Sequence, residues 1–555
     1  MAISDLETGN VVQGLDSESR QMVIDTVKQL KNRILTKENI LKFDKEEIFP
    51  EEIIRSMLGP EIGLQLLFIP EAYGGLGGGA RDCFEVICEI SRICLGIATG
   101  FFAIQLGADP LIVGGTEEQK QKWLGAIANG ENLVAYAVTE PGAGSNLAAL
   151  KTKADPVTDD TGKITGYKIN GNKQFISTGG YADFITLLAN TPEGPSFFVV
   201  EKGTEGFVQG KGEEKHGIRS SNTSPLSFTD VFVPVENLIG GVPGNGMKQA
   251  NMVFGYTRLM VAAMSLGANK AVMDIVIPYA KERIQFGSTL SEKQGYTHKL
   301  IVPHVVNFEA ALAYTEEVAI RLDSGEEDLQ VEGAIAKLFA SESSNKAADD
   351  GMQALGGYGY IREFEIEKIK RDVKITCIYE GTSEILQSII STFRWKKTRK
   401  TKGGYYTSIS SEMQDMEKSL KDCGCRYYSL AAQALNHTIF LANDNRLTRQ
   451  QYIMFALADM ITHVEVGASM ARKAARLSDI GDPKAEYFKA MTRIFANKTA
   501  QLTGCNILTI LRGQNLFDKK AVSEFLEMVS YGKLADSFDN VIKDMDMVAN
   551  TLFER

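Results

Sequence analysis

The period of the hydrophobic pattern changes twice along this chain, and this change limits the possible folds more than any other feature. From about residue 17 to 130 apolar residues recur at helical spacing, as in Met22, Val23, Val27 and Leu30. Between about 131 and 246 the pattern alternates, as in residues 231–233, and an Asn170-Gly171 pair predicts a turn. Helical periods then return. The pattern predicts a mainly α protein with a central β domain.

The same pattern predicts the domain boundaries of the 555-residue chain. We expect an N-terminal helical domain at 1–130, a β domain at 131–246, a bundle of long helices at 247–393 and a further helical domain at 405–555. Residues 394–404 hold six basic side chains before two glycines, which is typical of a solvated linker. Contact of this basic run with anionic lipid heads is the alternative.

Composition excludes several classes of protein. The charge balance of −10 argues against a broad nucleic-acid surface, and 44% hydrophobic residues are ordinary for a globular chain. The first 20 residues have neither the basic-then-apolar order of a secretory signal nor an Arg-rich organellar presequence, so a cytoplasmic location is expected. No apolar run is expected to reach membrane-spanning length, because Asn269, Lys270 and Asp274 interrupt the longest candidate.

Common catalytic motifs are missing or weak. Residues 75–80 fit a GxGxxA pattern, but no acidic residue follows about 20 positions later, so a glycine-rich loop that caps a helix is favoured over a dinucleotide site. The five histidines are scattered and predict no metal site. The seven cysteines include Cys423-Gly424-Cys425, which we interpret as small residues at a helix start, with a redox pair as the less favoured alternative.

Three segments carry groups that are suited to ligand binding or catalysis. Residues 136–146 contain hydroxyl side chains and the glycines Gly142 and Gly144 at the end of a predicted strand and in the loop after it. In such a loop, backbone N–H groups can approach an anion or a planar ring. Residues 173–180 form a second such segment. Glu380 precedes Gly381 and a helix start with Thr382 as its cap. Taken singly, each is also explained as an ordinary strand end or capping residue.

Together these segments resemble the acyl-CoA dehydrogenase family. The resemblance covers about residues 15–393 and rests on motifs in family order at residues 69–75, 115–120, 136–145, 175–177, 282–287, 353–357 and 380. The extension to Arg555, and residues 328–337, resemble the very-long-chain branch. The resemblance implies an N-terminal helical domain, a middle β-barrel domain, a C-terminal four-helix bundle and an additional C-terminal helical domain.

The resemblance also implies the chemistry. Glu380 matches the family's catalytic base, which removes the α-proton of an acyl-CoA thioester while the β-hydride passes to N5 of FAD, giving a trans-2-enoyl-CoA. The positions that match the substrate site are Ser145, Arg258, Tyr379 and Gly381. Those that match cofactor contacts are Tyr136, Val138, Thr139, Ser145, Phe175, Ile176, Ser177, Arg283, Gln285, Phe286, Gln294, Gln353, Leu355, Gly356, Gly357, Thr382 and Glu384.

The resemblance also implies partners, and it leaves alternative functions open. Electrons are expected to pass to an electron-transfer flavoprotein, as in fatty acid β-oxidation, and a flavin completed by a neighbouring chain implies a homodimer or a dimer of dimers. The motif Gly255-Tyr256-Thr257-Arg258 has no carboxylate before the arginine, which supports Glu380 as base. The alternatives are an acyl-CoA oxidase, a dehydrogenase of a cyclic, aromatic-derived or dicarboxylic CoA thioester, and a scaffold protein with the same fold.

Overall fold

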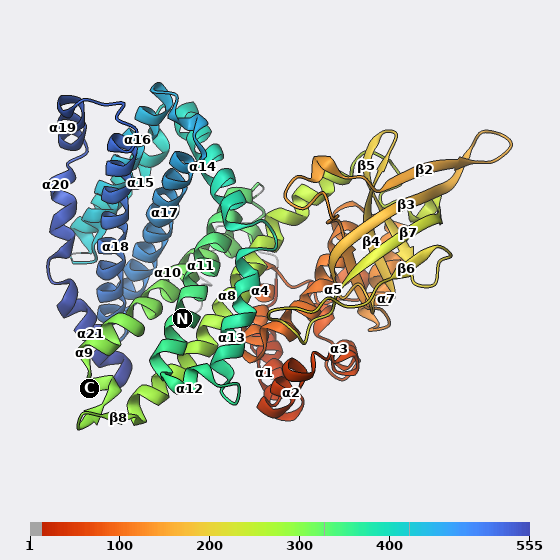
Figure 1. The fold of residues 1–555 in the computed structure, drawn as a ribbon, viewed down its shortest axis with the longest axis horizontal. Coiled ribbons are helices and arrows are strands. Elements are labelled where there is room, and N and C mark those ends of the chain that lie inside the picture. Colours follow the sequence, from red (N-terminus) through yellow and green to blue (C-terminus); the bar gives the residue numbers. More distant parts are fainter. Residues whose placement is uncertain (1–13, 327, 421) are drawn as a thin grey trace. The chain divides into compact units, whose positions relative to one another are not determined.

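The computed structural model describes residues 14–326, 328–420 and 422–555, which divide into two compact units (Figure 1). Unit 1 comprises Met1–Ala268, Ala319–Gln330 and Glu367–Glu380, and unit 2 comprises Asn269–Val318, Val331–Ile366 and Gly381–Arg555. Most of the N-terminal segment on which the cytoplasmic prediction rests lies outside the described residues.

Unit 1 begins with helices whose starts follow ordinary capping chemistry. Asp16 caps the first helix by accepting a hydrogen bond from Ser19 N–H at 2.8 Å. Gly79 is the N-cap of α4, which confirms the prediction that the glycine-rich loop at 75–80 caps a helix. The helices here are α1 (Ser17–Arg33), α2 (Lys37–Glu46), α3 (Glu51–Leu58), α4 (Ala80–Ile93), α5 (Leu95–Gly114), α6 (Glu117–Gln119) and α7 (Gly125–Ala128).

A sheet follows in unit 1, with strand order β1-β4-β2-β3-β7-β6 and β5 paired to β4. The strands are β1 (Val134–Ala137), β2 (Lys153–Thr158), β3 (Ile164–Ser177), β4 (Phe184–Thr191), β5 (Gly194–Glu201), β6 (Phe207–Gln209) and β7 (Thr223–Pro234). β1 pairs with β4 in parallel, whereas the long pairs β2·β3, β3·β7 and β4·β5 are antiparallel. Buried Tyr167, Ile169, Phe198 and Phe228 belong to its core.

The predicted turn at Asn170-Gly171 is wrong, because both residues lie inside β3. The pairing of β3 with β7 shifts register between Ile169 and Gly171, and Gly171 takes a φ of 152° there. A Cβ at this position would lie 2.7 Å from the Cα of Thr152, so glycine permits the close approach of the neighbouring chain. The β2–β3 turn lies at residues 159–163 instead, where Asp159 N–H donates to the carbonyl of Lys163.

Long helices make up most of the remaining chain. α8 (Gly246–Glu282), α10 (Val302–Asp323) and α11 (Gln330–Leu355) contribute residues to both units. Unit 2 also holds a small hairpin, β8 (Ile284–Gln285) and β9 (Ser288–Thr289). The other helices are α9 (Gln294–Leu300), α12 (Gly357–Tyr360), α13 (Glu365–Val373), α14 (Ser383–Lys400), α15 (Gly404–Ser419), α16 (Cys425–Asp444), α17 (Gln451–Asp479), α18 (Ala485–Arg512), α19 (Lys519–Met528), α20 (Tyr531–Leu534) and α21 (Val541–Phe553).

The segment predicted as a basic linker is largely helical. Residues 394–400 form the end of α14, and only a short turn at 401–403 separates it from α15. Arg394 is 3% exposed and pairs with both Glu332 at 2.8 Å and Glu465 at 2.7 Å. The prediction of a solvated linker is therefore wrong for this residue, because one of the six basic side chains is buried in an ion pair. A buried side chain also cannot contribute to a lipid-facing surface.

The prediction that no segment has membrane-spanning length is also wrong. By length and composition, α5, α8 and α17 are apolar enough to cross a membrane. The apolar windows of these helices are 83%, 72% and 89% buried within the protein. Their apolar character is therefore explained by packing against other protein segments.

Candidate active site

Glu380 lies where the backbone is strained. It follows a 3₁₀ turn at Lys374–Cys377 and has a φ of 55°, a left-handed conformation that is uncommon for a residue with a side chain. Gly381, with a φ of 95°, follows it. Backbone strain of this kind costs on the order of 1–3 kcal/mol and is concentrated at functional sites. The Thr257 hydroxyl, on α8, donates a 2.9 Å hydrogen bond to Oε2 of Glu380.

Three buried polar groups in unit 1 interact electrostatically with Glu380, and each includes an atom that finds no hydrogen-bond partner among the described residues. They are the Tyr136 hydroxyl, Asp109 Oδ2 and the Nε and NH1 groups of Arg258. Because a buried polar atom without a partner costs free energy, such atoms in an active site mark positions that a ligand can satisfy. Their convergence on one carboxylate defines a candidate reaction centre.

The charges of these groups are set by burial. Burial raises the pKa of Asp109 well above its ordinary range, and the charge of Glu380 raises it further, so both favour the protonated form of this carboxyl group. Burial lowers the pKa of Arg258, while Glu380 opposes this shift. Asp109 was not predicted from the sequence, although a single acidic residue within the apolar run at 95–114 is a signal that it has a special role.

A buried ion pair shapes the loop after β1. Lys173 on β3 donates 2.9 Å hydrogen bonds to the carbonyl of Val138 and to Oε1 of Glu140. Burial lowers the pKa of Lys173 to about 8. Burial alone would raise the pKa of Glu140, but hydrogen bonds from residues 151, 152 and 173 hold this pKa below its ordinary value. The pair fixes the strand exit that the sequence predicts as a cofactor loop, although its role was not predicted.

The two segments predicted to contact the flavin ring lie side by side in unit 1. The backbone N–H of Gln174 donates to the carbonyl of Thr139 at 2.9 Å, which places the two predicted segments side by side. Phe175 has a φ of 59° and is 63% exposed. A Cβ added to Gly142 or Gly144 would meet no atom within 4 Å, so the loop leaves open space. The predicted residues on these segments are Tyr136, Val138, Thr139, Ser145, Phe175, Ile176 and Ser177.

The substrate positions fall in both units. In unit 1, the hydroxyl of Tyr379 lies 3.3 Å from Sδ of Met264, and burial raises its pKa. Arg258 is 6% exposed. In unit 2, the carbonyl of Gly381 accepts a 2.7 Å hydrogen bond from Nζ of Lys337.

Unit 2 holds a cavity of about 550 Å³. Six residues predicted for the cofactor line it: Arg283, Gln285, Gln353, Leu355, Gly356 and Gly357. Phe286 and Gln294 are not in its lining. The Phe286 ring is 98% exposed, and the amide of Gln294 donates to Asp546 at 2.9 Å. Thr382 caps α14 as predicted, accepting from Ile385 N–H at 3.4 Å, and Glu384 lies in the first turn.

A larger cavity, of about 1200 Å³, lies in unit 1. Gly255 and Tyr256, the two residues before Thr257, form part of its lining, together with residues 113–114 at the end of α5. The Tyr256 hydroxyl accepts a 2.6 Å hydrogen bond from the amide of Gln105. Because a Cβ at Gly255 would meet no atom within 4 Å, the glycine keeps this side of the cavity open.

Comparison with known proteins assigns the family. Residues 17–131 match the N-terminal domain of acyl-CoA dehydrogenases, residues 135–231 match the middle domain, and residues 244–393 and 422–526 match the C-terminal domain. The chain therefore belongs to the acyl-CoA dehydrogenase family.

Individual relatives extend this result. An acyl-CoA dehydrogenase of Bacillus subtilis (strain 168) is 38% identical over 63% of this chain and 91% of its own. The cyclohex-1-ene-1-carbonyl-CoA dehydrogenase of Geobacter metallireducens is 34% identical over 67% and 97%. A crystal structure of an acyl-CoA dehydrogenase complexed with FAD from Bacillus anthracis superposes with a TM-score of 0.84 at 25% identity, and covers 97% of this chain and 95% of that one.

The residues of this chain fit the FAD that the family binds. The cavity of unit 2 combines the guanidinium of Arg283 with glycines 356 and 357, where an added Cβ would meet no atom within 4 Å, as close approach to a pyrophosphate requires. In unit 1, the buried Tyr136 hydroxyl has no hydrogen-bond partner among the described residues, and the loop at Gly142 and Gly144 leaves open space. The protein is an FAD-dependent oxidoreductase that acts on acyl-CoA.

Proposed function

We propose that this protein converts an acyl-CoA into the corresponding trans-2-enoyl-CoA, with Glu380 as the base that removes the α-proton. The observation that carries the proposal is the Glu380 carboxylate, anchored through one oxygen by Thr257 in a cluster of buried, partly unpartnered polar groups. An α-proton beside a thioester is weakly acidic, so its removal needs a positioned carboxylate in a site that excludes water.

Each side chain near Glu380 has a separate role in this proposed reaction. Bound FAD supplies the acceptor for the β-hydride. Thr257 holds Oε2 of Glu380, which orients the carboxylate to take the α-proton. Burial and the charge of Glu380 both favour the neutral form of Asp109, which opposes a second negative charge in the site. The buried Arg258 places a positive charge where it interacts electrostatically with the Glu380 carboxylate.

Replacing the base tests this proposal directly. We expect Glu380→Gln to reduce the rate of flavin bleaching by acyl-CoA at least about 100-fold, with the flavin still bound. Glu52→Gln, at an exposed position on α3, is the matched control and is expected to keep wild-type activity. An unchanged bleaching rate in the Glu380 variant would reject the assignment.

We further propose an electron-transfer flavoprotein as the acceptor. An acyl-CoA oxidase would use the same base and cofactor but reduce dioxygen. Turnover with an electron-transfer flavoprotein under anaerobic conditions, without comparable peroxide formation in air, is the expected outcome; stoichiometric peroxide would favour the oxidase.

A cyclic thioester substrate is a second candidate. It is favoured by the open side of the 1200 Å³ cavity at Gly255 and by the similarity to the Geobacter metallireducens dehydrogenase. A panel of straight, branched, cyclic and dicarboxylic CoA esters, compared by kcat/KM for flavin bleaching, separates the candidates.

We propose a homodimer or dimer of dimers in the cytoplasm. Near the Arg283 cavity of unit 2, Ile284 is 61% exposed and Phe286 98% exposed, an arrangement that suits a surface covered by a second copy, with the cavity receiving the pyrophosphate and adenosine of its flavin. We expect Phe286→Asp to weaken both self-association and FAD retention. Light scattering and the flavin-to-protein absorbance ratio measure these, and cell fractionation tests the location.

A further inference from the structure

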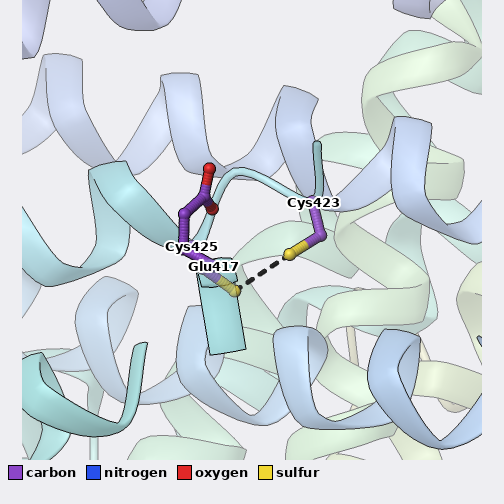
Figure 2. Close-up of side chains that lie close together, drawn as sticks. All are labelled: Glu417, Cys423 and Cys425. Carbon is purple, nitrogen blue, oxygen red and sulfur yellow. Dashed lines mark hydrogen bonds between the residues drawn. The ribbon is translucent and has the colours of Figure 1, made fainter. Parts of the chain in front are cut away.

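The Cys423-Gly424-Cys425 sequence forms a close pair of sulfurs in the turn between α15 and α16 of unit 2. The two Sγ atoms point toward one another and lie 3.0 Å apart (Figure 2). Both residues are fully buried. The interpretation as small residues at a helix start accounts for their position, since α16 begins at Cys425, but it does not account for paired sulfurs.

The surrounding chain holds this turn firmly. Gly424 has a φ of 79°, and a Cβ there would lie 2.8 Å from the Cβ of Ala496 on α18. Arg493 on the same helix donates a hydrogen bond to the carbonyl of Asp422. Cys423 Sγ lies 3.0 Å from the carbonyl of Leu420. The turn therefore keeps the sulfurs together, and only glycine fits between them.

A carboxylate lies beside the pair. The ligand atoms of Glu417, Cys423 and Cys425 all lie within 4.8 Å of one another, and Figure 2 shows Glu417 beside the two cysteines. Glu417 Oε2 is fixed by a 3.1 Å hydrogen bond from Arg426 N–H. This arrangement fits either three ligands of a metal ion or a dithiol with a nearby proton acceptor.

The distance between the sulfurs decides between these possibilities. Two thiolates on one tetrahedral zinc ion, each about 2.3 Å from the metal, lie about 3.8 Å apart. The observed 3.0 Å is shorter, as expected when two sulfurs face each other directly. The group also offers three ligands, whereas a structural zinc site uses four.

We propose that Cys423 and Cys425 are a redox modification site that forms a reversible intramolecular disulfide with a hydroperoxide as oxidant. The Cys423 thiolate attacks one peroxide oxygen, giving a sulfenic acid and hydroxide; Cys425 then displaces the sulfenic hydroxyl and closes the S–S bond. With hydrogen peroxide, two thiols lose two electrons and two protons, and the peroxide becomes two waters. A dithiol reductant reverses the change by exchange.

The two cysteines have different roles in this step. The hydrogen bond from Cys425 lowers the pKa of the Cys423 thiol, which makes Cys423 the attacking sulfur. The hydrogen bond to Cys423 and burial both raise the pKa of Cys425. Glu417 is placed to accept the Cys425 proton as the disulfide closes.

Thiol counting on the holoenzyme tests the proposal without any variant. After treatment with a few equivalents of hydrogen peroxide, denaturation and alkylation, we expect five of the seven cysteines to be modified. Mass spectrometry should find a loss of two hydrogens in the peptide that holds residues 423 and 425. Dithiothreitol should restore seven reactive thiols.

Variants identify the residues. Cys423→Ser and Cys425→Ser should each abolish the two-hydrogen loss, whereas Cys505→Ser, at an exposed cysteine on α18, should retain it. Glu417→Gln should slow closure about tenfold. Seven alkylated cysteines after peroxide, a sulfinic acid on either residue without a disulfide, or one equivalent of zinc lost on Cys423→Ser would each overturn the proposal.

Discussion

Thr257 donates a hydrogen bond to the carboxylate of Glu380, the proposed base. Thr257→Val keeps the shape of the side chain but removes the donor to Glu380 Oε2. Because a hydrogen bond to the ionised form favours that form, its loss makes the carboxylate harder to ionise and less well oriented. We expect kcat/KM to fall about tenfold and the acid limb of its pH profile to move to higher pH.

A matched variant separates this effect from the loss of any buried hydroxyl. Thr315 is also buried, and its hydroxyl donates a hydrogen bond to the carbonyl of Ala311 on its own helix. Thr315→Val is expected to leave the pH profile unchanged. If both variants behave alike, Thr257 has no special role in catalysis.

The buried carboxyl group of Asp109 should make the free energy of unfolding depend on pH. Its pKa is raised in the folded protein, so the unfolded chain releases this proton first as pH rises above about 4, and wild-type stability declines from there. Asp109→Asn removes the titration, and Oδ2 has no partner to lose. We expect the variant to gain stability relative to wild type as pH rises above about 4, because only the wild type loses stability through this titration.

Urea unfolding at several pH values measures this difference. Each pH unit within the titration window adds up to about 1.4 kcal/mol. Asp155→Asn, at an exposed position on β2, should show no such trend. Parallel pH dependence of wild type and Asp109→Asn would show that Asp109 is ionised in the folded protein.

At the scale of elements, Arg394 joins α14 to two other helices of unit 2. It pairs with Glu332 on α11 and Glu465 on α17, and the Tyr406 hydroxyl also donates to Glu465 at 3.1 Å. Arg394→Met leaves two buried carboxylates without their cation. We expect a destabilisation of about 3–5 kcal/mol, seen as a lower Tm. Lys400→Met, exposed on the same helix, should change Tm little; equal shifts would show that the buried network contributes nothing specific.

Elements were easier to predict than the contacts that position them. The motif at residues 378–385 predicted the Thr382 cap correctly, because local sequence determines capping, whereas the role of Glu380 as the base stays a prediction. The bulge at Gly171, the Glu140–Lys173 pair and the burial of Arg394 depend on residues distant in sequence. Asn-Gly and a basic run have strong local preferences, and tertiary packing overrode both.

At the scale of the whole molecule, the predicted site residues divide between the two units. Those for the flavin ring and the base belong to unit 1, and those around the 550 Å³ cavity belong to unit 2. Sequence order could not reveal this division, because residues 319–330 and 367–380 belong to unit 1 although the segments around them belong to unit 2. The full extent of unit 2, which includes the C-terminal extension, was likewise not predictable from local pattern.

Because unit 2 includes residues 404–555, we predict that this C-terminal extension forms part of the hydrophobic core of unit 2. Phe339 on α11 packs against His463 and Phe495, whose rings lie 5.5 Å from it. A chain that ends at Gly403 loses α15–α21 and exposes the apolar face of α11 together with Arg394 and Glu332. We therefore expect this truncation to aggregate or to elute as large species, with little bound flavin.

The control is the full chain with Phe538→Ser, a substitution of an exposed apolar residue in the extension that should leave the protein well behaved. Size-exclusion chromatography and the ratio of flavin to protein absorbance are the measurements. A truncated protein that elutes as a defined species with full flavin content would show that the extension is an independent appendage.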